Sequence, residues 1–412
     1  MGRSPLPSLA AAVVLGLAAV SGVTSAQAAV PPGTWQVLRS VSPDPTKVDD
    51  SLFTGVSLAS ASDGWAVGNF SNPKAVDKPL AEHWDGRAWR ITAVPPLPQG
   101  GTSGELNGVD EVAPANVWAA GTLNPADGAR TLIEHFTGKS WTVVPSPDPF
   151  TGAGASDDLN AIGGTSAHDL WAVGFDFDGS NLAQGLFEHF NGTAWQAAPP
   201  LSAPGIPDFQ AVSAIARNDV WAVGTSLSTS DSTLAAHWNG HTWQVVTTPC
   251  LSGTMIISTE DGCPESQNEL TGVTAVAANN VWASGFENES SDLRVPYVLH
   301  WDGTTWSLTM TPDPNAGQDD TGSSLQGIAA VSASDIWAVG ISEDAASTIT
   351  TLTEQFNGST WSVVPSPSPG LLGDDALFGI TGAGGTQLFA VGSDEQSGQC
   401  CTRTLALQNT SG

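Results

Sequence analysis

One short pattern recurs along the chain at nearly constant spacing. A Trp-Ala-Val-Gly run ends at Gly68, Gly174, Gly224 and Gly340. The aromatic residue of this run, or of a looser copy, recurs every 50 to 61 residues, at Trp65, Trp118, Trp171, Trp221, Trp282, Trp337 and Phe389. Large and small side chains alternate within the run, as in a β-strand whose two faces pack differently. The chain is therefore an array of repeats.

Each repeat carries two further signatures. A short apolar segment such as "ELNGV" or "DLNAI" precedes the Trp run, and "LxEHW" followed by "DGxxW" or "NGxxW" comes after it. A unit therefore holds four short strands. A period of about 50 residues with four strands per repeat is typical of a β-propeller. We predict an all-β fold, a seven-bladed β-propeller of four-stranded blades, over residues 29–412.

The two ends of the chain complement each other. The last unit stops at "TLALQNTSG" (404–412), after its third strand. The missing fourth strand occurs near the start, as "GTWQVLRSV" (33–41). We expect this N-terminal strand to complete the last blade and close the ring, which would remove an exposed sheet edge.

Residues 1–28 read as a secretory signal peptide. Arg3 precedes an apolar run at Leu9–Val20, and small residues stand at Ala26 and Ala28. The apolar run is too short for a transmembrane helix, and no later segment reaches that length. We therefore expect a secreted, extracellular monomer without a transmembrane segment.

The charge balance is strongly acidic. The chain has 41 Asp and Glu against 12 Lys and Arg, a formal net charge of −29. This balance argues against nucleic acid as a partner, because phosphate binding needs clustered Lys and Arg. It suits a solvated surface or the binding of cations.

The order "VWAVG…EHWDGxxW…VPSPxP" resembles a kelch repeat, as in galactose-oxidase-type propellers. The "DGTTW" and "NGTAW" turns resemble the Asp-box of sialidase-type propellers, and "HWDGxxW" is similar to blades of some bacterial lectins. These resemblances imply the propeller fold. The copper site of galactose oxidase, as the resemblance implies, needs two Tyr, whereas this chain has only Tyr297. Sialidase chemistry needs an Arg cluster and a Tyr nucleophile, and neither motif is matched.

The loops between the second and third strands, and those that link the units, vary in length and content and share one face, the variable-loop face. Polar residues recur near the start of the inner strands, on this face. Thr54 occupies this position in the first unit. The equivalents that we predict to bind a ligand are Asn107, Asn160, Gln210, Thr271 and Gln326, with acidic residues just before them at Glu105, Asp158, Asp208 and Glu269. This ring would surround the mouth of a central channel and could hold a sugar, a peptide or a cation. The alternative is that the amides bond the backbone of neighbouring blades and the acids are solvated.

Three further sets suggest metal or disulfide chemistry. Five His recur on the third strands, at His83, His135, His189, His237 and His300. Their spacing of one blade is too wide for one zinc ion, so we expect each to bond within its own blade. The segment "DFDGSN" supplies Asp176, Asp178 and Asn181, an oxygen-rich turn that resembles part of a calcium loop but lacks its downstream bidentate Glu. An ordinary acidic turn is the simpler interpretation. Calcium is the only cofactor that the sequence suggests.

The four Cys fit an oxidising compartment. Cys250 and Cys263 bracket the long connection after the fourth unit, and we predict a disulfide between them. The pairing of Cys400 and Cys401 stays open.

These features favour a secreted, non-catalytic protein that recognises a carbohydrate or a protein ligand on its variable-loop face. Its partner would be a glycan or an extracellular protein. One alternative is an extracellular hydrolase or lyase acting on polysaccharide, for which the adjacent acids Asp157 and Asp158 are candidates. The other is a cell-envelope scaffold for protein interactions.

Overall fold

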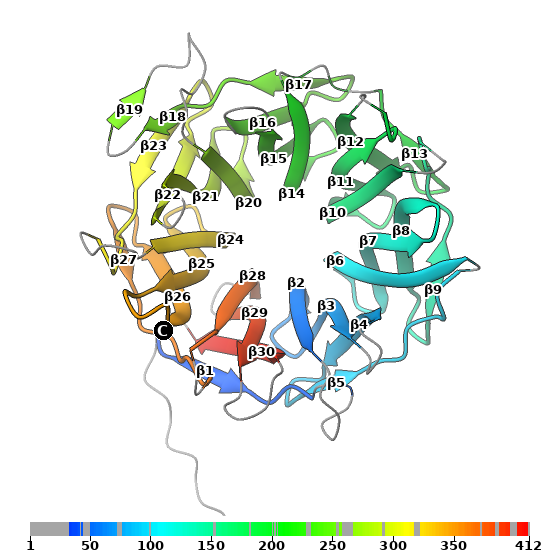
Figure 1. Cartoon of the computed structure of the whole chain (residues 1–412), viewed down its shortest axis with the longest axis horizontal. Helices are drawn as coiled ribbons and strands as arrows, with labels where there is room; N and C mark the ends of the chain where they lie inside the picture. The colour runs from blue at the N-terminus through cyan, green and yellow to red at the C-terminus, as the bar shows by residue number, and fades with distance from the viewer. Residues whose placement is uncertain are drawn as a thin grey trace, which may run out of the picture. The chain divides into compact units, whose positions relative to one another are not determined.

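The computed structural model describes residues 33–41, 43, 50–71, 76–98, 100–150, 154–180, 183–199, 201, 203, 205–227, 232–252, 255–257, 267–290, 293–316, 322–370, 373–383, 387–395 and 402–410. Regular structure in these residues is entirely β (Figure 1). None of them belongs to a helix with the length and apolar character needed to cross a membrane. The predicted signal peptide lies outside the described residues.

The strands follow the predicted order of four antiparallel strands per unit, from the inner strand outward. The first three units are β2 (Ser51–Ser60), β3 (Asp63–Ser71), β4 (Asp77–Trp84) and β5 (Trp89–Ile91); β6 (Gly101–Ala113), β7 (Asn116–Pro125), β8 (Gly128–Phe136) and β9 (Trp141–Val144); β10 (Ala155–Ser166), β11 (Asp169–Phe177), β12 (Ala183–Phe190) and β13 (Trp195–Ala197). The next two are β14 (Ile206–Ala216), β15 (Asp219–Leu227), β16 (Ser232–Trp238) and β17 (Trp243–Val246); β20 (Gln267–Ala277), β21 (Asn280–Ser290), β22 (Leu293–Trp301) and β23 (Trp306–Met310). The last strands are β24 (Gly322–Ser332), β25 (Asp335–Glu343), β26 (Ile349–Phe356) and β27 (Trp361–Val363); β28 (Ala376–Ala383), β29 (Gln387–Glu395) and β30 (Thr402–Thr410).

Two features depart from a uniform array. A short parallel pairing of β8 with β10, at Gly128 and Ala155, joins the second and third units into one eight-stranded sheet. The long connection after the fourth unit contains a hairpin of its own, β18 (Cys250–Ser252) and β19 (Met255–Ile257). The repeat pattern predicted neither feature, because both lie in segments that differ between units.

The N-terminal strand β1 (Trp35–Leu38) is the outer strand of the sheet formed by β28, β29 and β30. It pairs with β30 in antiparallel register, with Trp35 opposite Asn409 and Val37 opposite Leu407. The Trp35 ring packs edge-on against Trp337, with ring centroids 5.8 Å apart. Trp35 is 3% exposed and belongs to a core cluster with Trp337, so this first strand contributes to the hydrophobic core.

The inner strands lie around a common axis (Figure 1) and pack backbone against backbone. A Cβ atom placed on Gly55 would lie 3.1 Å from the carbonyl oxygen of Asn107 in the next unit. One placed on Gly379 in the last inner strand would lie 3.2 Å from the carbonyl oxygen of Thr54 in the first. The predicted small residue is therefore required by the close approach of the strands.

We predict that Trp35→Ala lowers the free energy of unfolding by about 3–5 kcal/mol, the usual cost of removing a large buried aromatic side chain. The matched control is Val37→Ala on the same strand, whose side chain is 49% exposed and whose loss should change the unfolding free energy by less than about 0.5 kcal/mol. Urea titration followed by tryptophan fluorescence measures both. Equal midpoints for Trp35→Ala and the unsubstituted protein would contradict the contribution of β1 to the core.

Candidate functional site

Each inner strand carries a β-bulge at the same position. The pairing between the first and second strands skips one residue in every unit, namely Thr54, Asn107, Asn160, Gln210, Thr271, Gln326 and Phe378. The glycine that ends the Trp run faces this bulge. A Cβ atom on Gly174 would lie 2.0 Å from the carbonyl oxygen of Asp158, so no larger residue fits there. The bulge redirects the skipped side chain out of the sheet pattern.

The seven bulge residues line one narrow cavity of about 200 Å³ on the common axis of the inner strands. The structure therefore brings together all five predicted amide and hydroxyl residues, with Thr54 beside them. The seventh position, Phe378, is apolar. The sequence analysis did not predict Phe378, because the set was defined by its polar side chains.

Four of the polar bulge residues bond the next unit. Their side chains donate to the carbonyl oxygen that precedes the next bulge. The four bonds are Thr54 to Leu106 at 2.7 Å, Asn107 to Leu159 at 2.9 Å, Asn160 to Phe209 at 3.0 Å and Thr271 to Leu325 at 2.7 Å. Gln326 instead bonds Ser324 in its own strand, at 3.1 Å. For these four residues the alternative to ligand binding therefore holds: their side chains bond the backbone of the neighbouring unit and so link the units.

The four predicted acids are half-buried and lie beside the cavity, not in its lining. Burial raises the pKa of Glu105, and the nearby charges of Asp77 and Asp158 raise it further. Burial also raises the pKa of Asp208 to about 6, although Asn160 donates to its carboxylate at 2.9 Å. The charge of Asp158 acts on Asp208 as well, so three of the acids interact across consecutive units.

The fourth acid, Glu269, accepts a 3.4 Å hydrogen bond from Asn288 on β21. The four acids belong to four consecutive units, the second to the fifth, and so place negative charge along one side of the polar opening. Such an opening attracts a cationic group.

The five predicted His each bond within their own unit, as expected. In the second unit His135 stacks on Trp118 with ring centroids 3.8 Å apart, and its Nε2 lies 2.7 Å from Oδ1 of Asn116. Burial lowers the pKa of His135. The five pairs are His83 with Asp63, His135 with Asn116, His189 with Asp169, His237 with Asp219 and His300 with Asn280.

The predicted calcium residues have separate partners. Asp176 is buried and accepts a hydrogen bond from Gln184 at 3.2 Å, whereas Asp178 accepts one from the Ser180 hydroxyl at 2.9 Å. Asn181 lies outside the described residues. In the described part of the chain, no group of three or more His, Cys, Asp or Glu is arranged to hold a metal ion. The calcium site stays a prediction.

The predicted disulfide also stays a prediction. The backbone of Cys250 begins β18, and Cys263 lies outside the described residues. Cys400 and Cys401 lie outside them as well.

The adjacent acids considered for hydrolysis do not act as a pair. Asp157 is fully buried, and its Oδ2 accepts a hydrogen bond from the Phe150 backbone at 3.2 Å. Asp158 is half-buried and bonded to Ser156. Neighbouring residues of a strand point to opposite faces, so the two carboxyl groups cannot flank one bond.

The sequence reasoning missed a set of fully buried carboxyl groups on the third strands. Glu82, Glu134, Glu188 and Glu354 are at most 1% exposed. Burial raises the pKa of Glu134 from 4.5 to about 8, and Oε2 of this residue has no hydrogen-bond partner among the described residues. The equivalent residues of three other units are Ala236, Leu299 and Leu407. The position therefore accepts an uncharged side chain, and burial favours the neutral form of its glutamates.

We predict that Asn160→Ala lowers the unfolding free energy by about 1–3 kcal/mol, because it leaves the Phe209 carbonyl without its partner. Gln326→Ala is the matched control. Among the described residues its amide bonds only Ser324 of its own strand, so its loss should cost under about 1 kcal/mol. Urea unfolding of both variants checks the difference, and an equal cost would contradict the inter-unit role.

We further predict that stability falls as the pH rises from about 4.5 to about 8. Over this pH range the folded chain keeps a proton on Glu134 that the unfolded chain has lost. The free energy of unfolding therefore falls by up to about 1.4 kcal/mol per pH unit. Glu134→Gln should leave stability unchanged at pH 4 and raise it at pH 8 by about 1–3 kcal/mol. Urea unfolding at both pH values is the measurement. A Glu134→Gln variant that is less stable at pH 8 would show that this glutamate is buried as an ion.

No family model matches the sequence, and no curated protein sequence matches it. Among solved structures, the chain is similar to a β-propeller described as YCF48 bound to D1 peptide, with a TM-score of 0.53, 14% identity, and 93% of this chain and 99% of that chain covered. A protein of unknown function from Dyadobacter fermentans gives a TM-score of 0.50 at 10% identity, with 92% and 99% covered. A fucose-specific lectin from Aleuria aurantia gives only 0.42 at 11% identity, with 78% and 100% covered, and has no bearing on the ligand. The chain therefore has a propeller-type all-β fold, and no family is assigned to it.

Proposed function

We propose that this chain is a secreted, non-catalytic binding protein, a seven-bladed propeller that β1 closes and that takes a protein ligand on its variable-loop face. The ligand class we favour is an extracellular peptide segment with a basic residue. The observation that carries this proposal is the row of interacting, half-buried acids Glu105, Asp158 and Asp208 beside the polar cavity. A single Lys or Arg side chain placed there would relieve the repulsion among the acids.

Two contacts support closure by the N-terminal strand. The Trp35–Trp337 contact reproduces the edge-on contact between Trp65 and Trp141 in the first two units. The hydroxyl pair of Ser40 and Thr404, 2.6 Å apart, reproduces that of Thr131 and Ser146, 2.7 Å apart. Residues 33–41 thus make the contacts of a fourth strand.

A carbohydrate ligand is the second candidate, and the polar lining of the cavity favours it. The amide oxygen of Asn107 and the side chain of Gln210 could meet sugar hydroxyls. The solved structure described as YCF48 bound to D1 peptide supports the peptide class only as a precedent for the fold. The polysaccharide hydrolase and the envelope scaffold have no specific observation in their favour.

The test is a binding screen of residues 29–412 against basic peptides and a glycan array, with calcium and with chelator. We predict that Asp208→Asn lowers the affinity for a basic peptide about fivefold or more, since it removes one negative charge from the acidic rim, the set of acids beside the axial cavity. The matched control is Asp302→Asn on the opposite face, at a turn position that Asn occupies in other units, such as Asn191. It should change the affinity less than about twofold.

Saturable binding of a glycan, with an affinity that neither substitution changes, would replace the peptide proposal with the carbohydrate one. Absence of saturable binding in every arm, or equal weakening by both variants, would overturn binding at the rim.

A further inference from the structure

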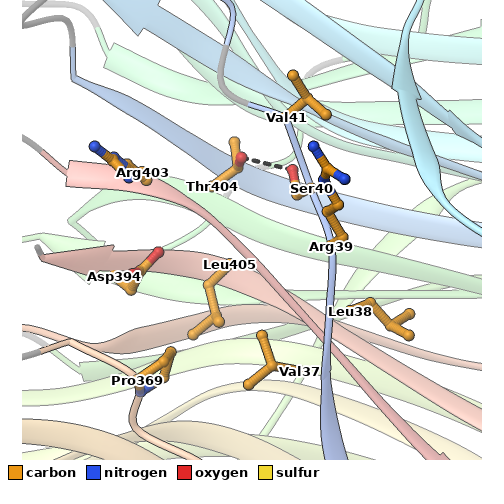
Figure 2. A pocket seen from close by; sticks show the side chains of 10 residues that line it. All are labelled: Val37, Leu38, Arg39, Ser40, Val41, Pro369, Asp394, Arg403, Thr404 and Leu405. Carbon is orange, nitrogen blue, oxygen red and sulfur yellow. Dashed lines mark hydrogen bonds between the residues drawn. The ribbon is translucent and has the colours of Figure 1, made fainter. Parts of the chain in front are cut away.

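A second cavity, of about 360 Å³, lies where β1 meets β30, away from the residues that line the axial cavity (Figure 2). Its aliphatic wall includes Val37, Leu405 and Pro369. Its charged residues are Arg39, Arg403 and Asp394. Nothing in the repeat pattern predicts this combination.

The strand register explains why these side chains meet. Val37 lies opposite Leu407, and Asp394 lies opposite Arg403. Side chains two residues apart share a face of a strand. Arg403 and Leu405 therefore lie on the face of Leu407. Arg39 comes directly after the last residue of β1 and lines the same cavity. Pro369 reaches this face from the segment after β27.

Arg39 is the distinctive residue of the cavity. It is exposed, and the structure gives its guanidinium no acidic partner among the described residues. Other arginines have one, such as Arg90 with Asp85 at 2.6 Å and Arg130 with Asp127 at 2.8 Å. No other unit has an arginine at the equivalent position, so the guanidinium is particular to this junction. The equivalents are Ala93, Pro145, Pro199, Thr247, Met310 and Pro365.

The hydroxyl groups of the cavity already have partners. Ser40 and Thr404 lie 2.6 Å apart, and Ser40 also donates to Glu82 at 3.2 Å. The polar contacts of a ligand would therefore come mainly from the Arg39 guanidinium. With Asp394 counted against Arg39 and Arg403, the wall carries one net positive charge in a chain whose formal charge is −29.

We propose that this cavity binds a carboxylate attached to a branched aliphatic group, as in the C-terminal leucine of a peptide or a small free acid. Arg39 binds the carboxylate, since a guanidinium group can donate two parallel hydrogen bonds to a carboxylate in a bidentate pair. Val37, Leu405 and Pro369 receive the aliphatic part. A volume of about 360 Å³ is in the range of small-molecule sites. This inference does not depend on the function proposed for the acidic rim.

The test is isothermal titration of the secreted form with N-acetyl-leucine and with its uncharged analogue N-acetyl-leucinamide. We expect saturable binding of the acid and at least about tenfold weaker binding of the amide. Arg39→Gln should lower the affinity for N-acetyl-leucine about tenfold or more. It should leave the melting temperature unchanged, because the side chain is exposed. Arg87→Gln, the loss of an exposed arginine in the turn between β4 and β5 that does not line the cavity, is the matched control and should leave the affinity unchanged.

The source of the ligand is distinguished by a third probe, N-acetyl-Gly-Gly-leucine. Tighter binding than N-acetyl-leucine indicates a peptide end, and equal binding indicates a free acid; both support the proposal. Equal binding of acid and amide, an unchanged affinity in Arg39→Gln, or no saturation below ~10 mM would overturn it. Sodium acetate binding as tightly as N-acetyl-leucine would overturn the aliphatic part.

Discussion

The structure depends on one close contact that every unit repeats, between the glycine that ends the Trp run, in the middle of the second strand, and the bulged inner strand. A side chain at Gly224 would place its Cβ 2.0 Å from the carbonyl oxygen of Asp208, so only glycine lets the two strands stay paired across the bulge. The bulge in turn directs one side chain per unit to the axial cavity. Architecture and candidate site therefore share the same residues. A substitution such as Asn160 to a larger residue would alter both at once.

This sharing limits what the axial cavity can do chemically. The amide of Asn160 donates to both Asp208 and the Phe209 carbonyl, so its donors are already used. What remains for a ligand is the acceptor capacity of the lining and the negative charge of the adjacent acids. Binding of a cationic or hydroxyl-rich group fits that inventory better than proton transfer does.

Two sets of acidic residues have different physical roles. Those beside the axial cavity are half-buried and interact with one another, whereas those of the third strands are fully buried between units. Burial raises the pKa of Glu354 to about 8, as it does for Glu82. Burial favours the neutral form of these groups, which lowers the charge of the folded protein below the formal value of −29. The equivalent position holds an uncharged residue, Ala236, Leu299 or Leu407, in three other units.

Much of the architecture could be read from the sequence because it is repeated. The alternation in Trp-Ala-Val-Gly predicted the strands, and the constant spacing predicted the units. The inter-unit bond of Asn107 could only be left as an alternative, since a sequence does not show which carbonyl lies nearest. The hairpin that begins at Cys250 and the parallel pairing at Ala155 escaped prediction because each occurs once.

The sequence by itself determined the repeated strand order, the small residues on the inner strands and the positions of the polar set. Each of these follows from local periodicity and side-chain size. Only the tertiary structure decided that the polar residues lie at bulges and that glutamates such as Glu134 are buried. It also decided that Arg39 shares a cavity with Arg403, which is 364 residues later in the chain. Those outcomes depend on strand register and on contacts between units, and neither is encoded in the spacing of residues along a single repeat.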